Sequence, residues 1–184
     1  MISLDSPTAT PDADVRLVEG VADVDDLDEF LATVDEIRSE TGAVVQLFDA
    51  RYVVSREHLT RAVALAERAA GRDETVARDR AVEVLLYAAG RRQIDRALEM
   101  GVSEGEVPAV AVAYAPASDA DATTDVDAAA DRVADLLTPA ETLDDLDRGR
   151  VMDFFDVTEA ELTATTGTLT DVVLERVALL DVEK

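Results

Sequence analysis

Apolar residues recur at helical spacing in several stretches of the chain, and a glycine follows most of them. Residues 25–40 place apolar side chains three and four positions apart, which predicts an amphipathic helix that ends at Gly42. The same spacing predicts helices over residues 56–70, 76–89 and 92–100, each directly followed by glycine. Four helices are therefore expected in the first hundred residues.

Three other stretches have the pattern of strands. Apolar and polar residues alternate over 15–17, which predicts a first strand. Residues 43–48 (AVVQLF) and 109–114 (AVAVAY) are short apolar runs without alternation, and proline bounds the second of them on both sides. Such runs are typical of strands that are covered on both faces.

The C-terminal half is predicted to be helical. A short helix is expected over 127–137 and another helical stretch over 143–154. Thr158 and Glu161 have the spacing of a capping box, so a further helix should begin at Thr158. Residues 169–180 predict a last helix that is apolar on nearly all sides, which is typical of a core helix or of a helix that binds a partner.

Together these elements predict an α/β fold of the α+β type. We expect a small mixed β-sheet of three to four strands that is covered by helices. Residues 1–12 are predicted to form a flexible N-terminal tail, because they are polar and contain proline, and residues 13–184 a single domain. The chain has no run of the roughly 20 apolar residues that would span a bilayer, and no signal-peptide pattern at its start, so we expect a cytoplasmic protein with no membrane contact.

The charge is extreme and unevenly distributed. The net charge is −24, and the basic residues are 16 Arg with a single Lys. Residues 51–100 hold ten Arg against eight acids, a net of +2, whereas the remainder holds seven basic groups against 33 acids, a net of −26. This composition resembles that of proteins from extreme halophiles, whose self-repulsion is screened in molar salt. The spared basic stretch is a candidate contact for an acidic partner.

The same basic stretch carries a recognisable motif. Residues 80–97 read RAVEVLLYAAGRRQIDRA and contain the string E-x-L-x-Y-x-x-G-x-R-Q-I from Glu83 to Ile94. This string resembles the small kinase-binding subunit of the KEOPS complex, the PRPK-binding protein family. Weaker likenesses flank it at residues 49–66 and 156–162. The chain departs from a typical family member in being far more acidic.

The resemblance implies a non-catalytic, archaeal regulatory subunit. Its complex forms threonylcarbamoyladenosine in tRNA. The subunit binds and stimulates the kinase/ATPase subunit, and in archaea it also binds the 3′ CCA end of tRNA. Contact with the threonylcarbamoyl transferase subunit is expected to be indirect.

Two sets of contact residues are predicted. Guanidinium groups bind phosphates and stack on bases, and aromatic rings stack on splayed bases. The predicted tRNA contact is therefore Arg78, Tyr87, Arg91, Arg92, Gln93 and Arg96. The alternative is that these arginines pair with acids on helix surfaces and that Tyr87 is a core residue. The predicted kinase contact is the last helix, through Leu169, Val173, Leu174, Val177 and Leu180, with a fully docked core helix as the alternative.

Two other functions compete with this interpretation. One is a small carboxylate-based metabolic enzyme, and the other is a protein-interaction module without an RNA role. The chain has no Cys, which excludes thiolate chemistry, and no Gly-rich phosphate loop. Its one histidine, His58, is expected at the surface or core edge. The acidic cluster at residues 119–127 lacks the Gly and Glu of a calcium loop, so no metal site and no cofactor are expected.

Overall fold

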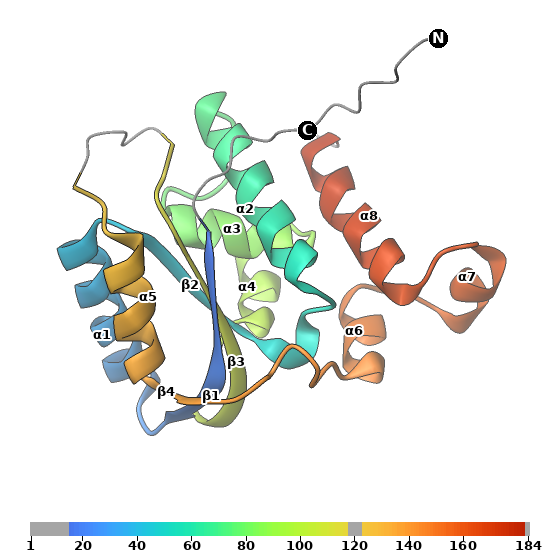
Figure 1. Ribbon diagram of the computed structural model, residues 1–184. Helices are drawn as coiled ribbons and strands as arrows, with labels where there is room; N and C mark the ends of the chain where they lie inside the picture. Colours follow the sequence, from blue (N-terminus) through green and yellow to red (C-terminus); the bar gives the residue numbers. More distant parts are fainter. Residues whose placement is uncertain (1–14, 118–122, 183–184) are drawn as a thin grey trace, which may run out of the picture.

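The computed structural model describes residues 15–117 and 123–182. Its centre is a sheet of four strands in the order β2-β3-β1-β4 (Figure 1). The strands are β1 (Arg16–Val24), β2 (Val44–Asp49), β3 (Gly105–Tyr114) and β4 (Leu137–Pro139). The predicted α/β class and strand number are confirmed, whereas the tail predicted for residues 1–12 lies outside the described residues.

The sheet is antiparallel at every described pairing, so the prediction of a mixed sheet was wrong. β3 pairs with β1 on one side and with β2 on the other, antiparallel in both cases. β1 and β2 run in the same direction, but β3 lies between them, so they never pair. The three-residue strand β4 pairs with the other edge of β1. Its first residue, Leu137, was predicted to be the last residue of a helix.

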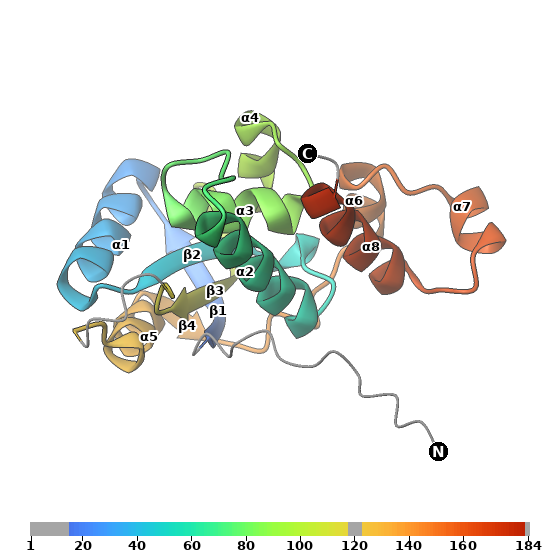
Figure 2. The ribbon, with the colours of Figure 1, turned by 90° about the horizontal axis from the view of Figure 1, so that it is seen from above.

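Helices cover both faces of the sheet (Figure 2). The helices α1 (Leu27–Thr41) and α5 (Val126–Asp135) pack on one face, and α2 (Arg56–Gly71) and α3 (Arg80–Ala89) pack on the other. Strand β3 explains this arrangement, because its small Ala109, Ala111 and Ala113 face the first pair while Val110, Val112 and Tyr114 face the second. The expectation that its apolar run is covered on both faces is confirmed.

Local signals set most helix ends. The Asp26 carboxylate accepts a hydrogen bond from the backbone N–H of Glu29, and Gly42 ends α1 in the left-handed conformation at φ 72°. Several predicted boundaries were wrong, and the first strand, for example, extends to Val24 instead of ending at residue 17. Gly71 lies inside α2, and the left-handed residue beyond it is Asp73 at φ 54°. Helix α3 begins at Arg80 instead of residue 76, because the buried Glu83 side chain binds the backbone of Val76 and Ala77.

The remaining helices are short except the last. They are η1 (Ala50–Tyr52), α4 (Ile94–Ala97), η2 (Leu98–Met100), α6 (Arg148–Phe154), α7 (Glu159–Ala164) and α8 (Leu169–Val182). The helix predicted over 92–100 is thus a single α-turn followed by a 3-10 turn. Thr158 caps α7 as predicted, because its hydroxyl accepts a hydrogen bond from the N–H of Glu161. Helix α8 packs against α2 and α3 (Figures 1 and 2).

Within the described residues, none of the helices combines the length and the apolar character that crossing a membrane requires.

Candidate protein and RNA contact surface

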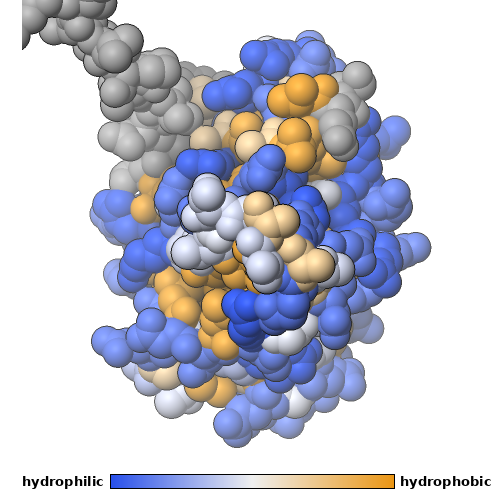
Figure 3. All heavy atoms as spheres, turned by 90° about the vertical axis from the view of Figure 1, so that its right-hand side faces the viewer, coloured by the Kyte–Doolittle hydropathy of each residue, from blue (hydrophilic) through white to orange (hydrophobic). Residues whose placement is uncertain are grey.

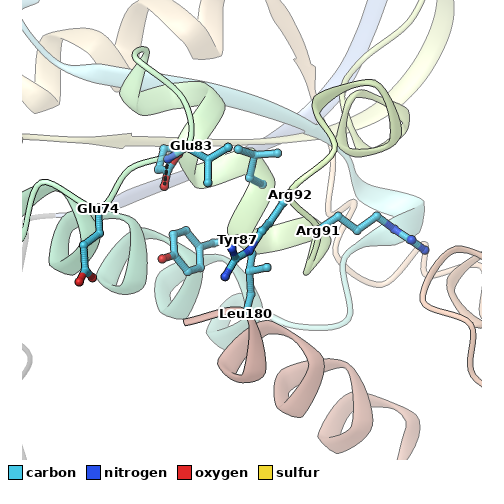
Figure 4. A pocket seen from close by; sticks show the side chains of 8 residues that line it. Glu74, Glu83, Tyr87, Arg91, Arg92 and Leu180 are labelled. Atoms are coloured by element: carbon cyan, nitrogen blue, oxygen red, sulfur yellow. Dashed lines mark hydrogen bonds between the residues drawn. The ribbon is translucent and has the colours of Figure 1, made fainter. Parts of the chain in front are cut away.

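Two neighbouring pockets lie beside α3 and share the side chain of Glu83. The first has a volume of about 40 Å³ and lies between the end of α3 and the end of α8. Its lining residues are Glu74, Val76, Glu83, Leu86, Tyr87, Arg91, Arg92 and Leu180 (Figure 4). The second has a volume of about 190 Å³ and lies between α2 and the loop before α3. Both pockets lie in the basic segment 51–100, apart from their contacts with β3 and α8.

Glu83 fixes the loop that separates the two pockets. Its side chain is buried, and its carboxylate accepts hydrogen bonds from the N–H of Val76 at 3.1 Å and of Ala77 at 2.8 Å. These bonds satisfy a buried charge and hold residues 76 and 77 outside the helix. Helix α3 therefore starts at Arg80, where Asp79 caps it by accepting from the N–H of Ala81 at 2.8 Å.

The second pocket has a polar wall held by Glu67. One carboxylate oxygen of Glu67 accepts from Arg80 at 2.6 Å and from the hydroxyl of Tyr114 at 3.0 Å. The other accepts from the N–H of Ala117 at 2.9 Å. Burial, followed by the charge of Glu67, raises the pKa of Tyr114 far above its ordinary value, so its hydroxyl remains a hydrogen-bond donor. This wall is rigid and internally satisfied.

Arg78 stands at the mouth of this pocket. Its side chain is exposed, and among the described residues it makes no hydrogen bond or ion pair. The other arginines of the chain all have an interaction partner. In a chain of net charge −24, an available guanidinium is an unusual feature of the surface.

The other predicted RNA contacts divide into two groups. Gln93, just before α4, and Arg96, on α4, are both exposed. Arg96 pairs with Glu99 at 3.2 Å, as the ion-pair alternative predicts. Arg92 is exposed and points toward the ring of Tyr87 (Figure 4). Tyr87 itself is only 3% exposed, which agrees with the core alternative.

Arg91 also lines the first pocket, but its side chain extends away from Tyr87 and Arg92 (Figure 4). Its guanidinium donates to the carbonyl of Phe154, lies 3.4 Å from a carboxylate oxygen of Asp156, and lies over the Phe154 ring at 4.9 Å. Only 18% of the side chain is exposed. The sequence predicted that Arg91 contacts RNA. In the structure its side chain instead binds the residues at the end of α6.

Helix α8 buries most of its predicted kinase contacts in its own chain. Leu169, Val173, Leu174 and Val177 are buried, and Leu180 is partly buried. Leu169, Val173 and Leu174 therefore form no exposed flank, and the first two pack in the core that includes α2 and α3. The apolar residues that do point outward are Leu179 and Val182, which are 39% and 77% exposed and were not among the predicted contacts.

The outward face of α8 could have been found by its spacing. Leu179 and Val182 follow the exposed Glu175 at intervals of four and seven residues, so all three share one face of the helix. Figure 3 looks onto the side of the molecule that carries α7 and α8, where apolar atoms show among hydrophilic ones. Leu179 and Val182 thus place apolar side chains near the C-terminal end of α8, on the same face as the acidic Glu175.

His58 is in the core, so its expected place at the surface or core edge was wrong. It is fully buried, Nε2 donates to the carbonyl of Ala88 at 2.8 Å, and Nδ1 accepts from the N–H of Val54 at 3.3 Å. Burial lowers the pKa of His58 to about 4, against the opposing effect of its bond to Ala88. Both ring nitrogens are occupied by backbone groups, which is a structural role.

The described residues contain no cluster of side chains suited to a metal ion. Of the acidic stretch 119–127, Asp125 caps α5 by accepting from the N–H of Ala128 at 2.9 Å. Asp127 pairs with Arg16 at 3.1 Å. The first part of that stretch lies outside the described residues.

Comparison with known proteins gives one family. The family model described as "Kinase binding protein CGI-121" matches residues 20–181, which include all four strands except the first residues of β1. No curated protein matches the chain.

Proposed function

This chain belongs to the CGI-121 family of kinase-binding proteins, and from that membership we propose that it is the regulatory subunit that binds the kinase/ATPase of a KEOPS complex. In this role it stimulates the kinase and helps to bind the 3′ CCA end of tRNA for threonylcarbamoyladenosine formation. The subunit does no chemistry of its own. Its contributions are two surfaces, one for the kinase and one for the RNA.

The exposed apolar end of α8 is the observation that supports the kinase contact. Leu179 and Val182 are exposed, and Leu180 beside them is partly exposed, on a chain with a net charge of −24. An exposed apolar patch rimmed by polar residues is typical of a protein–protein contact, and hydrophobic contact survives molar salt. We therefore place the kinase contact on Leu179, Leu180 and Val182, with the buried Leu169, Val173, Leu174 and Val177 supporting that helix from beneath.

The kinase contact is tested by charge substitution in α8. Leu179→Glu should raise the dissociation constant for the kinase subunit by about tenfold or more, because a charge then has to be buried in the contact. Binding would be measured by light scattering on a sizing column and by calorimetry in about 2 M KCl, where surface charges are screened. Leu31→Glu is the matched control, since Leu31 is 42% exposed on α1 and Leu179 is 39% exposed. Equal affinity of the two variants would contradict this placement.

The second pocket and Arg78 support the RNA contact. In molar salt, counterion release adds little to phosphate binding, so an RNA site has to rely on stacking and on hydrogen bonds to bases. A pocket of about 190 Å³ with fixed carboxylates and a tyrosine hydroxyl suits one unpaired base, and Arg78 at its mouth suits the adjoining phosphate. Arg92 lines the first pocket, and Arg92, Gln93 and Arg96 are all exposed. Tyr87 lines the same pocket and supports it from beneath.

The RNA contact is tested with tRNA that ends in CCA and with the same tRNA lacking CCA. Arg78→Glu and Arg92→Glu should each weaken binding of the complete tRNA by about tenfold at matched salt, since each removes a cation and adds an anion. Arg132→Glu, on α5 across the sheet, is the control. Filter binding or fluorescence anisotropy would measure the affinities. Unchanged affinity in both variants, or the same loss with tRNA lacking CCA, would rule out a CCA site here.

A further inference from the structure

Two arginines from different parts of the chain hold the turn that follows α6. Arg91 donates to the carbonyl of Phe154. Arg176 of α8 donates through Nε to the carbonyl of Phe155 at 3.2 Å and through a terminal nitrogen to the carbonyl of Asp156 at 3.4 Å. Three successive carbonyls thus accept from two guanidinium groups. We call Arg91, Arg176 and the turn Phe154–Asp156 the arginine clamp.

The clamp joins the end of α3 to the middle of α8. Arg91 directly follows Gly90, which ends α3 in the left-handed conformation at φ 62°. A Cβ at Gly90 would lie 3.4 Å from the carbonyl oxygen of Arg176, so the two backbones are in close contact there. Asp156 is also left-handed, at φ 54°, a conformation that residues other than glycine seldom adopt. The surrounding contacts therefore hold the turn in one shape.

The aromatic side chains of the turn anchor it in the core. Phe154 packs edge-on against Tyr52 at 5.2 Å, and Phe155 packs edge-on against His58 at 5.8 Å. The Arg91 guanidinium lies over the Phe154 ring, 4.9 Å from the ring centre. Its Nε is buried and has no hydrogen-bond partner among the described residues. Leaving a buried N–H without an acceptor costs free energy, which an arginine that served only as a surface charge would not have to bear. We therefore assign the role of Arg91 to its contacts with the Phe154 ring and carbonyl.

From this geometry we infer that Arg91 is a positioning residue for the kinase contact, in that it sets where α8 lies against α3 without touching kinase or RNA. This inference rests on the proposed kinase contact at the end of α8. It separates Arg91 from its neighbour Arg92, although the two arginines are adjacent in the motif and identical in charge. Both arginines line the first pocket, but the Arg91 guanidinium reaches the turn, whereas Arg92 points toward Tyr87.

The test compares Arg91→Ala, Arg176→Ala and the double variant with Arg132→Ala as the control, since Arg132 pairs with Glu40 on the far face of the sheet. Arg91→Ala and Arg176→Ala should each weaken kinase binding by about tenfold, and the double variant should lose little more than either, because both arginines hold one turn. Arg91→Lys should restore little of the loss, since an ammonium group lacks the planar fork. Affinities would be measured in about 2 M KCl on variants whose circular dichroism shows them to be folded.

Two further measurements separate positioning from RNA contact and from the proposed function. Hydrogen exchange should speed up at the amides of Phe155 and Val157 and in α8 for Arg91→Ala but not for Arg132→Ala. The salt dependence of tRNA binding should keep its slope in Arg91→Ala, whereas a phosphate contact would lower that slope by about one unit.

Unchanged kinase affinity and exchange in Arg91→Ala, full rescue by Arg91→Lys, or a lowered salt slope would each overturn the positioning role. Failure of the unmodified chain to bind the kinase would instead overturn the proposed function. In that case the exchange comparison still decides whether Arg91 places α8.

Discussion

At the scale of single residues, burial determines the protonation and the hydrogen-bond partners of the one histidine. The neutral ring of His58 links the start of α2 to the end of α3 through hydrogen bonds to two backbone groups. Protonation would place a charge on a fully buried ring and turn the acceptor of the Val54 N–H into a donor. The ring therefore stabilises the fold only while it is neutral.

This predicts a specific loss of stability in acid. The pKa of His58 is about 4 in the folded chain against 6.5 in the unfolded one, so between these values the unfolded state binds the additional proton. Stability is complete above pH 6.5 and should fall by about 3 kcal/mol as the pH drops to about 4. Denaturant unfolding across this range would measure the slope. His58→Gln, which cannot titrate, should show a shallower slope, and an identical slope would mean that His58 contributes nothing to it.

At the scale of elements, the start of α3 depends on a side chain from within that helix. Glu83 reaches back to the N–H groups of Val76 and Ala77 and holds the loop that borders both pockets. Helical spacing alone extends the helix back to residue 76. The hydrogen bonds from Val76 and Ala77 to the Glu83 side chain are what keep these two residues in the loop. The shape of the candidate RNA surface follows from where the helix starts.

Removal of this carboxylate should loosen the loop and lower stability. Glu83→Ala leaves a buried N–H without its acceptor, and we expect a loss of about 2 to 4 kcal/mol in the free energy of unfolding. Urea titration measures the loss, and hydrogen exchange at residues 76 and 77 locates it. Glu99→Ala removes an exposed, paired carboxylate on η2 and should change stability by less than about 0.5 kcal/mol. Similar effects of the two substitutions would show that the Glu83 bonds carry no special weight.

At the scale of the whole molecule, charge is the dominant feature. The 41 acids exceed the 17 basic residues by 24, so even complete pairing leaves many carboxylates without a cation. The ion pairs that form are largely at the surface, where each contributes little. Net repulsion thus opposes the folded state in dilute buffer and is screened in concentrated salt.

The expected result is a melting temperature that rises with salt. Between about 0.1 M and 2 M KCl we expect an increase of roughly 5 °C or more, equivalent to at least about 1 kcal/mol for a chain of this size. Calorimetry in a KCl series measures it, with sucrose as an uncharged comparison that acts by exclusion from the surface. An equal melting temperature at both ends of the series would show that charge repulsion does not limit the stability of the fold.

The sequence by itself determined the features that depend on near neighbours. Apolar spacing, capping residues and glycine positions located the long helices α1, α2 and α8, the cap at Thr158 and the doubly covered strand β3. The motif around Glu83–Ile94 indicated the family that the comparison then showed. These signals act within a few residues, so they can be read along the chain.

Only the tertiary structure decided which side of each element faces out. Val177 and Val182 are alike in the sequence of α8, yet the first is buried in the core that includes α2 and α3 and the second is exposed, because the helix docks on one side. Arg91 and Arg92 are likewise adjacent, and the turn after α6 takes only the first. The antiparallel sheet followed from the insertion of β3 between β1 and β2. Each of these outcomes depends on partners distant in the chain, which local spacing does not encode.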